Sequence, residues 1–143
     1  MTEVDSGRLI SAIKKIDAAY NRIMTDAAES CGLSRPEADV LIFFHNNPSF
    51  DTAQQFSELR GFSKSYTSKA IEQLMQKGLI WQKEDGTDRR FKHIVINESA
   101  TAQTSCLRRA QCEFIELVSS YMSPEESAAV ISAIDKLANS PLR

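Results

Sequence analysis

Apolar residues recur at helical spacing near the start of the chain. Between residues 6 and 31 they stand three or four positions apart, and the series runs Leu9, Ile13, Ile16, Tyr20, Ile23 and Ala27. Cys31 and Gly32 follow the series, and a glycine at that place is typical of a helix end. The pattern predicts one long amphipathic helix with an apolar seam close to a heptad repeat.

Start and stop signals predict two shorter helices after the first. Ser34 can cap the second helix, with Glu37 in the position that completes a capping box. Asn46, Asn47 and Pro48 are expected to stop this helix. Asp51 is the expected cap of the third helix, which should end before Gly61.

A fourth helix and a β-hairpin come next. Ser63 is expected to cap this helix and Gly78 to end it. The runs "LIWQKE" and "RFKHIVI" indicate two strands around a turn that contains Gly86. In the second run the side chains alternate, with Phe91, His93 and Val95 on one side and Lys92, Ile94 and Ile96 on the other. A short glycine-containing turn between the third and fourth helices predicts a helix-turn-helix, and the hairpin behind it makes a winged helix.

Two further helices are expected after residue 97. The first has an apolar seam at Leu107, Ala110, Phe114, Leu117 and Tyr121. Ser123 and Pro124 open the second, whose inner stripe is expected at Ile131, Ile134 and Leu137. The predicted fold is therefore mainly α with a small β-hairpin wing, and 143 residues suit a single domain, 1–143.

The net charge of −2 is unevenly distributed along the chain. Residues 1–57 carry five Lys and Arg against eight Asp and Glu, residues 58–97 carry eight against five, and residues 98–143 carry four against six. The middle part is therefore positive between two acidic flanks. It is where a polyanionic partner such as double-stranded DNA is expected to dock.

The fourth helix opens with residues suited to a DNA groove. They are Ser63, Lys64, Ser65, Tyr66, Thr67, Ser68 and Lys69. Small polar side chains let a helix approach base edges, while lysines and the free N–H groups of the helix N-terminus bind phosphate. Serine and threonine also open many helices merely as caps, but a cap requires only one such residue.

The hairpin tip adds a second group of cations. The group consists of Lys83, Arg89, Arg90 and Lys92. A wing of this kind can follow the DNA backbone or place an arginine in a narrow minor groove. Asp85 and Asp88 are expected to brace the two arginines. The alternative interpretation is an ion-paired surface turn of small energetic value.

Residues 62–97 resemble the recognition helix and wing of the MarR family of winged-helix transcriptional regulators. The positions that match the family pattern are Leu74, Gly78, Leu79, Ile80, Asp85, Asp88 and Arg90. Two features depart from it. Thr87 stands where many members have a further wing arginine, and "INESA" replaces the usual Leu-Thr-x-x-Gly junction after the wing.

The resemblance implies a winged helix-turn-helix at residues 34–97, between helical dimerisation regions at 6–31 and 98–140. It implies a homodimer on a palindromic operator, closed along the seams Leu9–Ile23 and Leu107–Tyr121. Carried over by position, the residues that face base edges, phosphates or the minor groove would be Ser63, Ser65, Tyr66, Ser68, Lys69 and Arg90. Lys64, Arg89 and Lys92 are expected to add contacts to the same DNA.

Family members often bind small amphipathic or phenolic anions between the dimer helices and the reading lobe. The resemblance therefore implies a possible small-molecule effector. Candidate pocket residues are Tyr20, Phe43, Phe44 and Phe114, although aromatic residues at helical spacing are more often part of a core.

Other function classes receive less support. The chain has no P-loop, GxGxxG, HExxH or nucleophile-elbow motif, so we expect neither an enzyme nor a cofactor or metal site. A winged helix that contacts protein without binding DNA specifically is one alternative, and architectural DNA binding without base discrimination is another. No secretory signal is evident and the longest apolar run, Val40–Phe44, is too short to cross a membrane, so the expected compartment is the cytoplasm.

The three cysteines and two histidines give weaker signals. Cys31, Cys106 and Cys112 fit neither a disulfide framework nor a metal pair. We expect buried structural thiols, with Cys31 as the first candidate for redox sensing. His45 is expected to be structural, and His93 is either structural or a phosphate contact.

Overall fold

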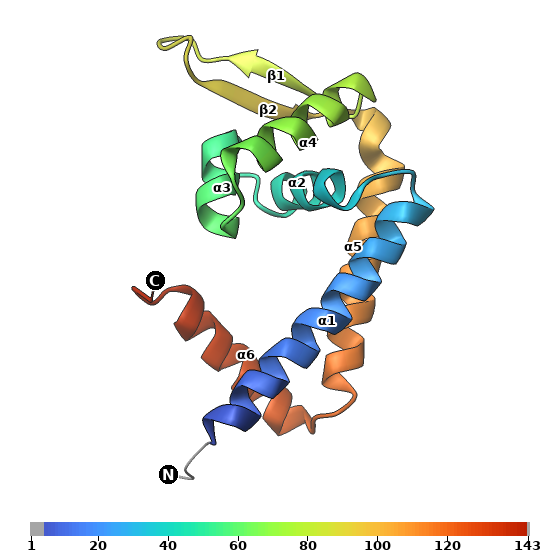
Figure 1. Ribbon diagram of the computed structural model, residues 1–143, viewed down its shortest axis with the longest axis vertical. Helices are drawn as coiled ribbons and strands as arrows, with labels where there is room; N and C mark the ends of the chain where they lie inside the picture. The colour runs from blue at the N-terminus through green and yellow to red at the C-terminus, as the bar shows by residue number, and fades with distance from the viewer. Residues whose placement is uncertain (1–4, 143) are drawn as a thin grey trace.

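The computed structural model describes residues 5–142 as helices around one short hairpin. In chain order the elements are α1 (Ser6–Ser30), α2 (Arg35–Asn46), α3 (Ala53–Arg60), α4 (Lys64–Gln76), β1 (Ile80–Glu84), β2 (Lys92–Ile96), the 3-10 turn η1 (Glu98–Ala100), α5 (Thr101–Ser119) and α6 (Pro124–Ala138). The helix order and the hairpin confirm the predicted fold. Figure 1 shows α4 and the hairpin together at one end of the molecule, with α1 and α5 forming a long stem that leads to α6.

Most helix starts follow the local sequence. Predicted N-caps that accept a hydrogen bond from the N–H three residues on are Ser34, Ser63 and Ser123. The structure contradicts the predicted cap of α3. Thr52 and not Asp51 receives the N–H of Gln55, and the Gln55 side chain accepts the Thr52 N–H in return. The Asp51 carboxylate is paired with His93 of β2, and this takes it away from the helix start.

The hairpin follows α4 directly. Gly78 ends the helix in a left-handed conformation with a φ of 71°, which glycine adopts at little cost. Leu79 N–H then donates to the Leu74 carbonyl at 3.1 Å, which satisfies an end carbonyl of α4. The strands pair antiparallel from Ile80 opposite Ile96 to Glu84 opposite Lys92, so the wing leaves the body of the molecule as a two-stranded ribbon.

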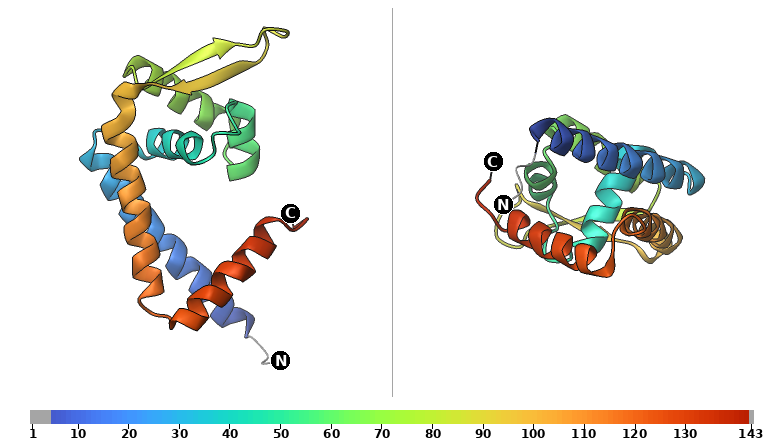
Figure 2. Two further views of the ribbon diagram at one scale, coloured as in Figure 1. Left: turned by 180° about the vertical axis from the view of Figure 1, so that it is seen from behind. Right: turned by 90° about the horizontal axis from the view of Figure 1, so that it is seen from below.

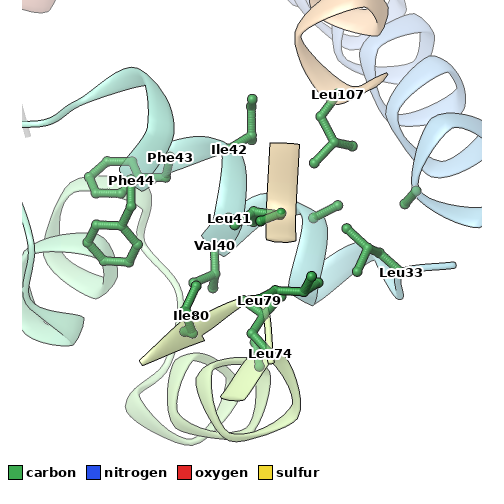
Figure 3. Packing of buried hydrophobic residues seen from close by; sticks show 14 of the residues in the cluster. Leu33, Val40, Leu41, Ile42, Phe43, Phe44, Leu74, Leu79, Ile80 and Leu107 are labelled. Atoms are coloured by element: carbon green, nitrogen blue, oxygen red, sulfur yellow. The ribbon is translucent and has the colours of Figure 1, made fainter. Parts of the chain in front are cut away.

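The core lies around α2. This helix packs against α1, α4, α5 and β2. Figure 3 shows Leu74, Leu79 and Ile80 on one side of α2 and Leu107 of α5 on the other. Leu41 of α2 is fully buried between them. The winged helix, residues 34–97 (called the reading head below), therefore rests on α5. Leu107 of the predicted seam packs in the core of its own chain.

The stem consists of α1 packed along α5. Tyr20 meets Phe114 edge to face, with ring centroids 5.1 Å apart, and the two views of Figure 2 agree that these helices run side by side. The seam predicted as a dimer contact at Leu107–Tyr121 therefore packs in part on α1 of the same chain. Among residues 5–142 no helix has the length and apolar character needed to span a bilayer.

The last helix contradicts its predicted packing. None of the residues of α6 is buried, and Ile131, Ile134 and Leu137 are 62%, 56% and 59% exposed. These side chains do not form an inner stripe within the chain. In Figure 1, α6 turns back from the end of α5 and its outer part stands free of the winged helix, so residues 5–142 leave its apolar side chains largely uncovered.

Candidate nucleic-acid interface

The first two turns of α4 present polar and basic side chains to solvent. Ser63 caps the helix, and its first turn contains no acid. The exposed members of the predicted set on this helix are Ser63, Lys64, Ser65, Ser68 and Lys69. Free N–H groups and the positive end of the helix dipole favour phosphate at such a start.

Thr67 fixes α4 against α3 from the opposite side of the helix. It is 1% exposed. Its hydroxyl lies 2.7 Å from that of Ser57 on α3 and donates to the Ser63 carbonyl at 3.0 Å. This partly buried pair of hydroxyls holds α3 and α4 in one orientation. The packing of Thr67 on α3 therefore determines which side of α4 faces solvent.

Tyr66 differs from the prediction. Its ring stacks on Phe62 with centroids 4.4 Å apart, and its hydroxyl donates to an Asp39 oxygen of α2 at 3.1 Å. Burial, together with the charge of Asp39, raises the pKa of Tyr66 to about 12. The phenol therefore faces the body of the protein in this structure, and we leave Tyr66 out of the proposed contact surface.

Asp39 joins the recognition helix to the stem. Its other oxygen accepts from Arg35 Nε at 2.8 Å. The same guanidinium donates to the Asn21 carbonyl at 3.1 Å and lies over the Tyr20 ring of α1 at 5.6 Å. A continuous polar network thus runs from α1 through α2 to Tyr66 on α4. The sequence gives no local signal for it, because the partners lie far apart along the chain.

Arg90 at the wing tip is braced as predicted. Its Nη2 donates to Asp88 Oδ2 at 2.8 Å, and its Nε donates to Oδ1 at 3.1 Å. The same bonds lower the pKa of Asp88 and raise that of Arg90. The Arg90 side chain is still 86% exposed, so it is held extended and accessible. Arg89 and Lys92 are also exposed, and no ion pair among the described residues involves Arg89.

Asp85 does not brace an arginine, and this part of the prediction is wrong. Its carboxylate accepts from the Thr87 hydroxyl at 2.8 Å and from the Asp88 N–H at 2.9 Å, which closes the turn. It also lies 2.8 Å from His93 Nε2. This imidazole bond, followed by the turn bonds, holds the pKa of Asp85 well below its usual range. Both ring nitrogens of His93 therefore lie next to carboxylates of the same chain. In this orientation neither nitrogen is free to contact a phosphate.

The cysteines divide into a pair and a single thiol. Cys106 Sγ lies 3.7 Å from the Ala27 carbonyl, close to the end of α1 where Cys31 is found. Burial, with Cys106 beside it, raises the pKa of Cys31 to about 11. Cys31 and Cys106 are half-buried and Cys112 is exposed, so none of the three is the buried thiol that was expected. A thiol that stays protonated at neutral pH reacts poorly, so the structure does not favour Cys31 as a redox sensor.

This difference predicts unequal labelling. In the native protein at pH 7.5, iodoacetamide should modify Cys31 about tenfold or more slowly than Cys112, because the thiolate fraction falls tenfold for each unit of pKa. Peptide mass spectrometry after timed alkylation measures both rates, and labelling in urea gives the unfolded reference. Equal native rates would contradict the half-buried, protonated state of Cys31.

A cavity of about 210 Å³ lies beneath the reading head. Residues of the stem and of the reading head line it. They are Tyr20, Asp39, Ile42, Phe43, Asn46, Phe56, Arg60, Phe62 and Gln111. Arg60 lies over the Phe43 ring at 5.1 Å and is exposed. Of the candidate pocket residues, Tyr20 and Phe43 line this cavity. Phe44 is buried in the core, and Phe114 lines a separate groove on the stem.

Comparison with known proteins supports the family suggested by these features. Residues 32–90 match a MarR family model. No match was found among the curated proteins. Because the family match spans α2 through the wing tip, it covers the elements that carry the exposed face of α4 and the two arginines.

Solved structures extend the likeness to most of the chain. A MarR transcriptional regulator from Methanosarcina mazei Go1 is 16% identical, with a TM-score of 0.77 over 92% of this chain and 94% of that one. A MarR protein from Peptoclostridium difficile is 18% identical, with a TM-score of 0.79 over 96% and 90%. S. aureus MepR, in a complex with DNA, is 17% identical, with a TM-score of 0.73 over 94% and 97%. These structures show that the chain has a winged-helix fold like theirs, and its residues 32–90 match the MarR family.

Proposed function

We propose that the protein is a sequence-specific DNA-binding transcriptional regulator that acts as a homodimer on a palindromic operator. One observation carries the proposal. The start of α4 is free of acids and exposes Ser63, Lys64, Ser65, Ser68 and Lys69, and it lies at the same end of the molecule as the arginine-bearing wing (Figure 1). A recognition helix in the major groove and a wing on the neighbouring backbone need this arrangement. The DNA complex of S. aureus MepR, a protein of similar fold, adds support.

In this proposal each group has a different task. Ser65 and Ser68 lie on the exposed side of α4 and would approach base edges. Lys64 and Lys69 would neutralise phosphates beside the groove. Arg90, held out by Asp88, would enter the minor groove or follow the backbone.

The homodimer is supported by apolar side chains that the single chain leaves exposed. On α1 they are Leu9, Ile10, Ile13 and Ile16, and on α6 they are Val130, Ile131, Ile134 and Leu137. We call these two sets the apolar face. Exposed apolar side chains in such numbers indicate an interface, and two copies would bury them by packing α1 and α6 of each chain around a two-fold axis.

A small-molecule effector fits the cavity beneath the reading head. The cavity combines aromatic walls with Arg60 at its edge, a lining that suits an aromatic or amphipathic anion. Because α1, α2, α3 and α5 all contribute to it, an occupant would touch both the stem and the reading head. It could shift DNA binding only if it bound two arrangements of these parts unequally.

The second candidate function is protein contact through the wing. Trp81 and Phe91 are each 47% exposed, and aromatic residues of this kind are enriched at protein interfaces. On α4 itself the one aromatic side chain, Tyr66, is half-buried, so the recognition helix favours DNA over a protein partner.

Selection from a random pool of duplexes tests the proposal directly. The purified protein should enrich an inverted repeat whose half-sites lie about one helical turn apart. Retention of duplexes without an enriched sequence would support architectural binding instead. Absence of retention even at low salt would contradict DNA binding and favour the protein-contact function.

Arg90→Ala is expected to weaken operator binding and to reduce its dependence on salt. Each lost phosphate contact lowers the log–log salt slope by roughly 0.9, and so by roughly twice that in a dimer. Fluorescence anisotropy between 0.05 and 0.3 M salt, on the order of physiological strength, measures both quantities. Arg90→Lys is the matched control, because it keeps the charge and should keep most of the slope. An unchanged slope for Arg90→Ala would remove the wing from the interface.

A further inference from the structure

One histidine ties the wing to the body of the winged helix. His93 lies on β2, with Nε2 2.8 Å from an Asp85 oxygen at the base of the wing turn. Its Nδ1 lies 2.9 Å from an Asp51 oxygen in the segment that precedes α3. The two carboxylates therefore stand at opposite edges of one imidazole ring, and each belongs to a different part of the reading head.

This arrangement favours a protonated ring. A neutral imidazole carries one N–H, so only one of its nitrogens can donate, whereas both face carboxylate oxygens here. The bonds to Asp51 and then Asp85 raise the pKa of His93. The His93 side chain is 30% exposed, so water weakens each pair without removing it.

The location of the bridge gives it a mechanical consequence. The backbone of β2 is already joined to the body at the same place, since Ile94 N–H donates to the Asp51 carbonyl at 2.6 Å. Beyond this point only the Glu84–Lys92 pair and the turn at residues 85–91 remain. The His93 bridge therefore restrains the turn that carries Arg89 and Arg90.

We propose that His93 is a positioning residue for the wing. As an imidazolium between Asp51 and Asp85, it fixes the angle of the hairpin and thereby the place of Arg89 and Arg90 relative to α4. The proposal deepens the DNA-binding function above and rests on it. The sequence alone could not indicate the bridge, because Asp51 and His93 are separated by α3 and α4 and each fits a more ordinary local role.

The bridge is expected to be lost at high pH. A group whose pKa is raised by folding stabilises the folded arrangement fully below its unfolded pKa of about 6.5, and this contribution disappears as the pH rises through the folded value. The acids that face the ring are Asp51 and Asp85, and the residue opposite it on β1 is Lys83. Operator affinity should therefore fall as the pH is raised above about 6.5 at fixed salt.

Two substitutions separate positioning from charge. Asp51→Ala removes a negative charge from the reading head, so simple electrostatics predicts tighter DNA binding. If the bridge positions the wing, the same change should weaken binding about threefold to tenfold, the scale of one or two partly exposed ion pairs. Glu84→Ala is the matched control, since it removes the same charge from an exposed wing residue. It should leave affinity unchanged or slightly increased.

A measurement without DNA tests the bridge itself. NMR titration of the His93 ring in the native protein and in urea compares its folded and unfolded states. The pKa of His93 should be higher in the native protein than in urea, and Asp51→Ala should lower the native value. Asp51→Ala should also make operator affinity less dependent on pH.

Each outcome bears on one claim. A native His93 pKa no higher than that in urea, or unchanged in Asp51→Ala, would overturn the bridge. A confirmed bridge with tighter DNA binding by Asp51→Ala would overturn its positioning role. If the wild-type protein binds no DNA, the proposed function fails, and the NMR titration still decides whether the imidazolium bridge exists.

Discussion

Replacing Ile13 with aspartate is expected to convert the protein from a dimer to a monomer. Ile13 lies in the middle of the exposed apolar series on α1 and is 56% exposed in the single chain. In a two-fold dimer the substitution would place two carboxylates in an apolar contact, and a buried unpaired charge costs several kcal/mol. Sedimentation velocity at micromolar concentration measures the change directly.

The control for this experiment is Ser11→Asp. It adds the same charge two residues away, on the opposite side of the helix, where Ser11 is also exposed. This variant should remain dimeric. Operator affinity should fall about a hundredfold or more in Ile13→Asp, because a single reading head loses the second half-site. A dimer that persists in Ile13→Asp would place the interface elsewhere.

The last helix supplies an independent readout. α6 has 15 residues and buries none of them within the chain, and isolated helices of this length are marginal in water. Its order should therefore depend on the partner. Circular dichroism of Ile13→Asp should show less helix than the wild type, and Ser11→Asp should show the wild-type signal.

The apolar pattern predicted the elements well because each is specified locally. The caps at Ser34, Ser63 and Ser123 satisfy the first N–H groups of their own helices. The same pattern could not say which partner an apolar stripe meets. Leu107 belongs to the predicted apolar stripe of α5 and Ile134 to that of α6. Leu107 is fully buried against the reading head, whereas Ile134 is 56% exposed.

The sequence predicted correctly those candidate-site residues that need only be exposed to solvent. Lys64, Ser68 and Arg90 are polar residues with solvent on one side, and the structure places them so. It was not predictable where a side chain has a distant partner. Tyr66 turns inward because Asp39, on α2, accepts its hydroxyl, and Asp51 leaves the start of α3 because His93 pairs with it. Both partners lie far away along the chain, so the residues near Tyr66 and Asp51 in the sequence could not indicate them.

Reversing the two lysines of the recognition helix is expected to abolish specific DNA binding. Lys64→Glu with Lys69→Glu changes four charges in each subunit at the surface that would face phosphate. Affinity at about 0.15 M salt should fall a hundredfold or more, and the log–log salt slope should fall by roughly 3 to 4 if each lysine neutralises one phosphate. Anisotropy titrations at several salt concentrations measure both effects.

The fold should survive this double substitution. Both side chains are exposed, glutamate is a good helix former, and acids near a helix N-terminus interact favourably with its dipole. The melting temperature should therefore stay close to that of the wild type. Arg22→Glu with Arg109→Glu makes the same change of charge on the stem, where the side chains line a groove between α1 and α5. If the stem variant weakened operator binding as strongly as the α4 variant, overall charge and not the face of α4 would determine DNA binding.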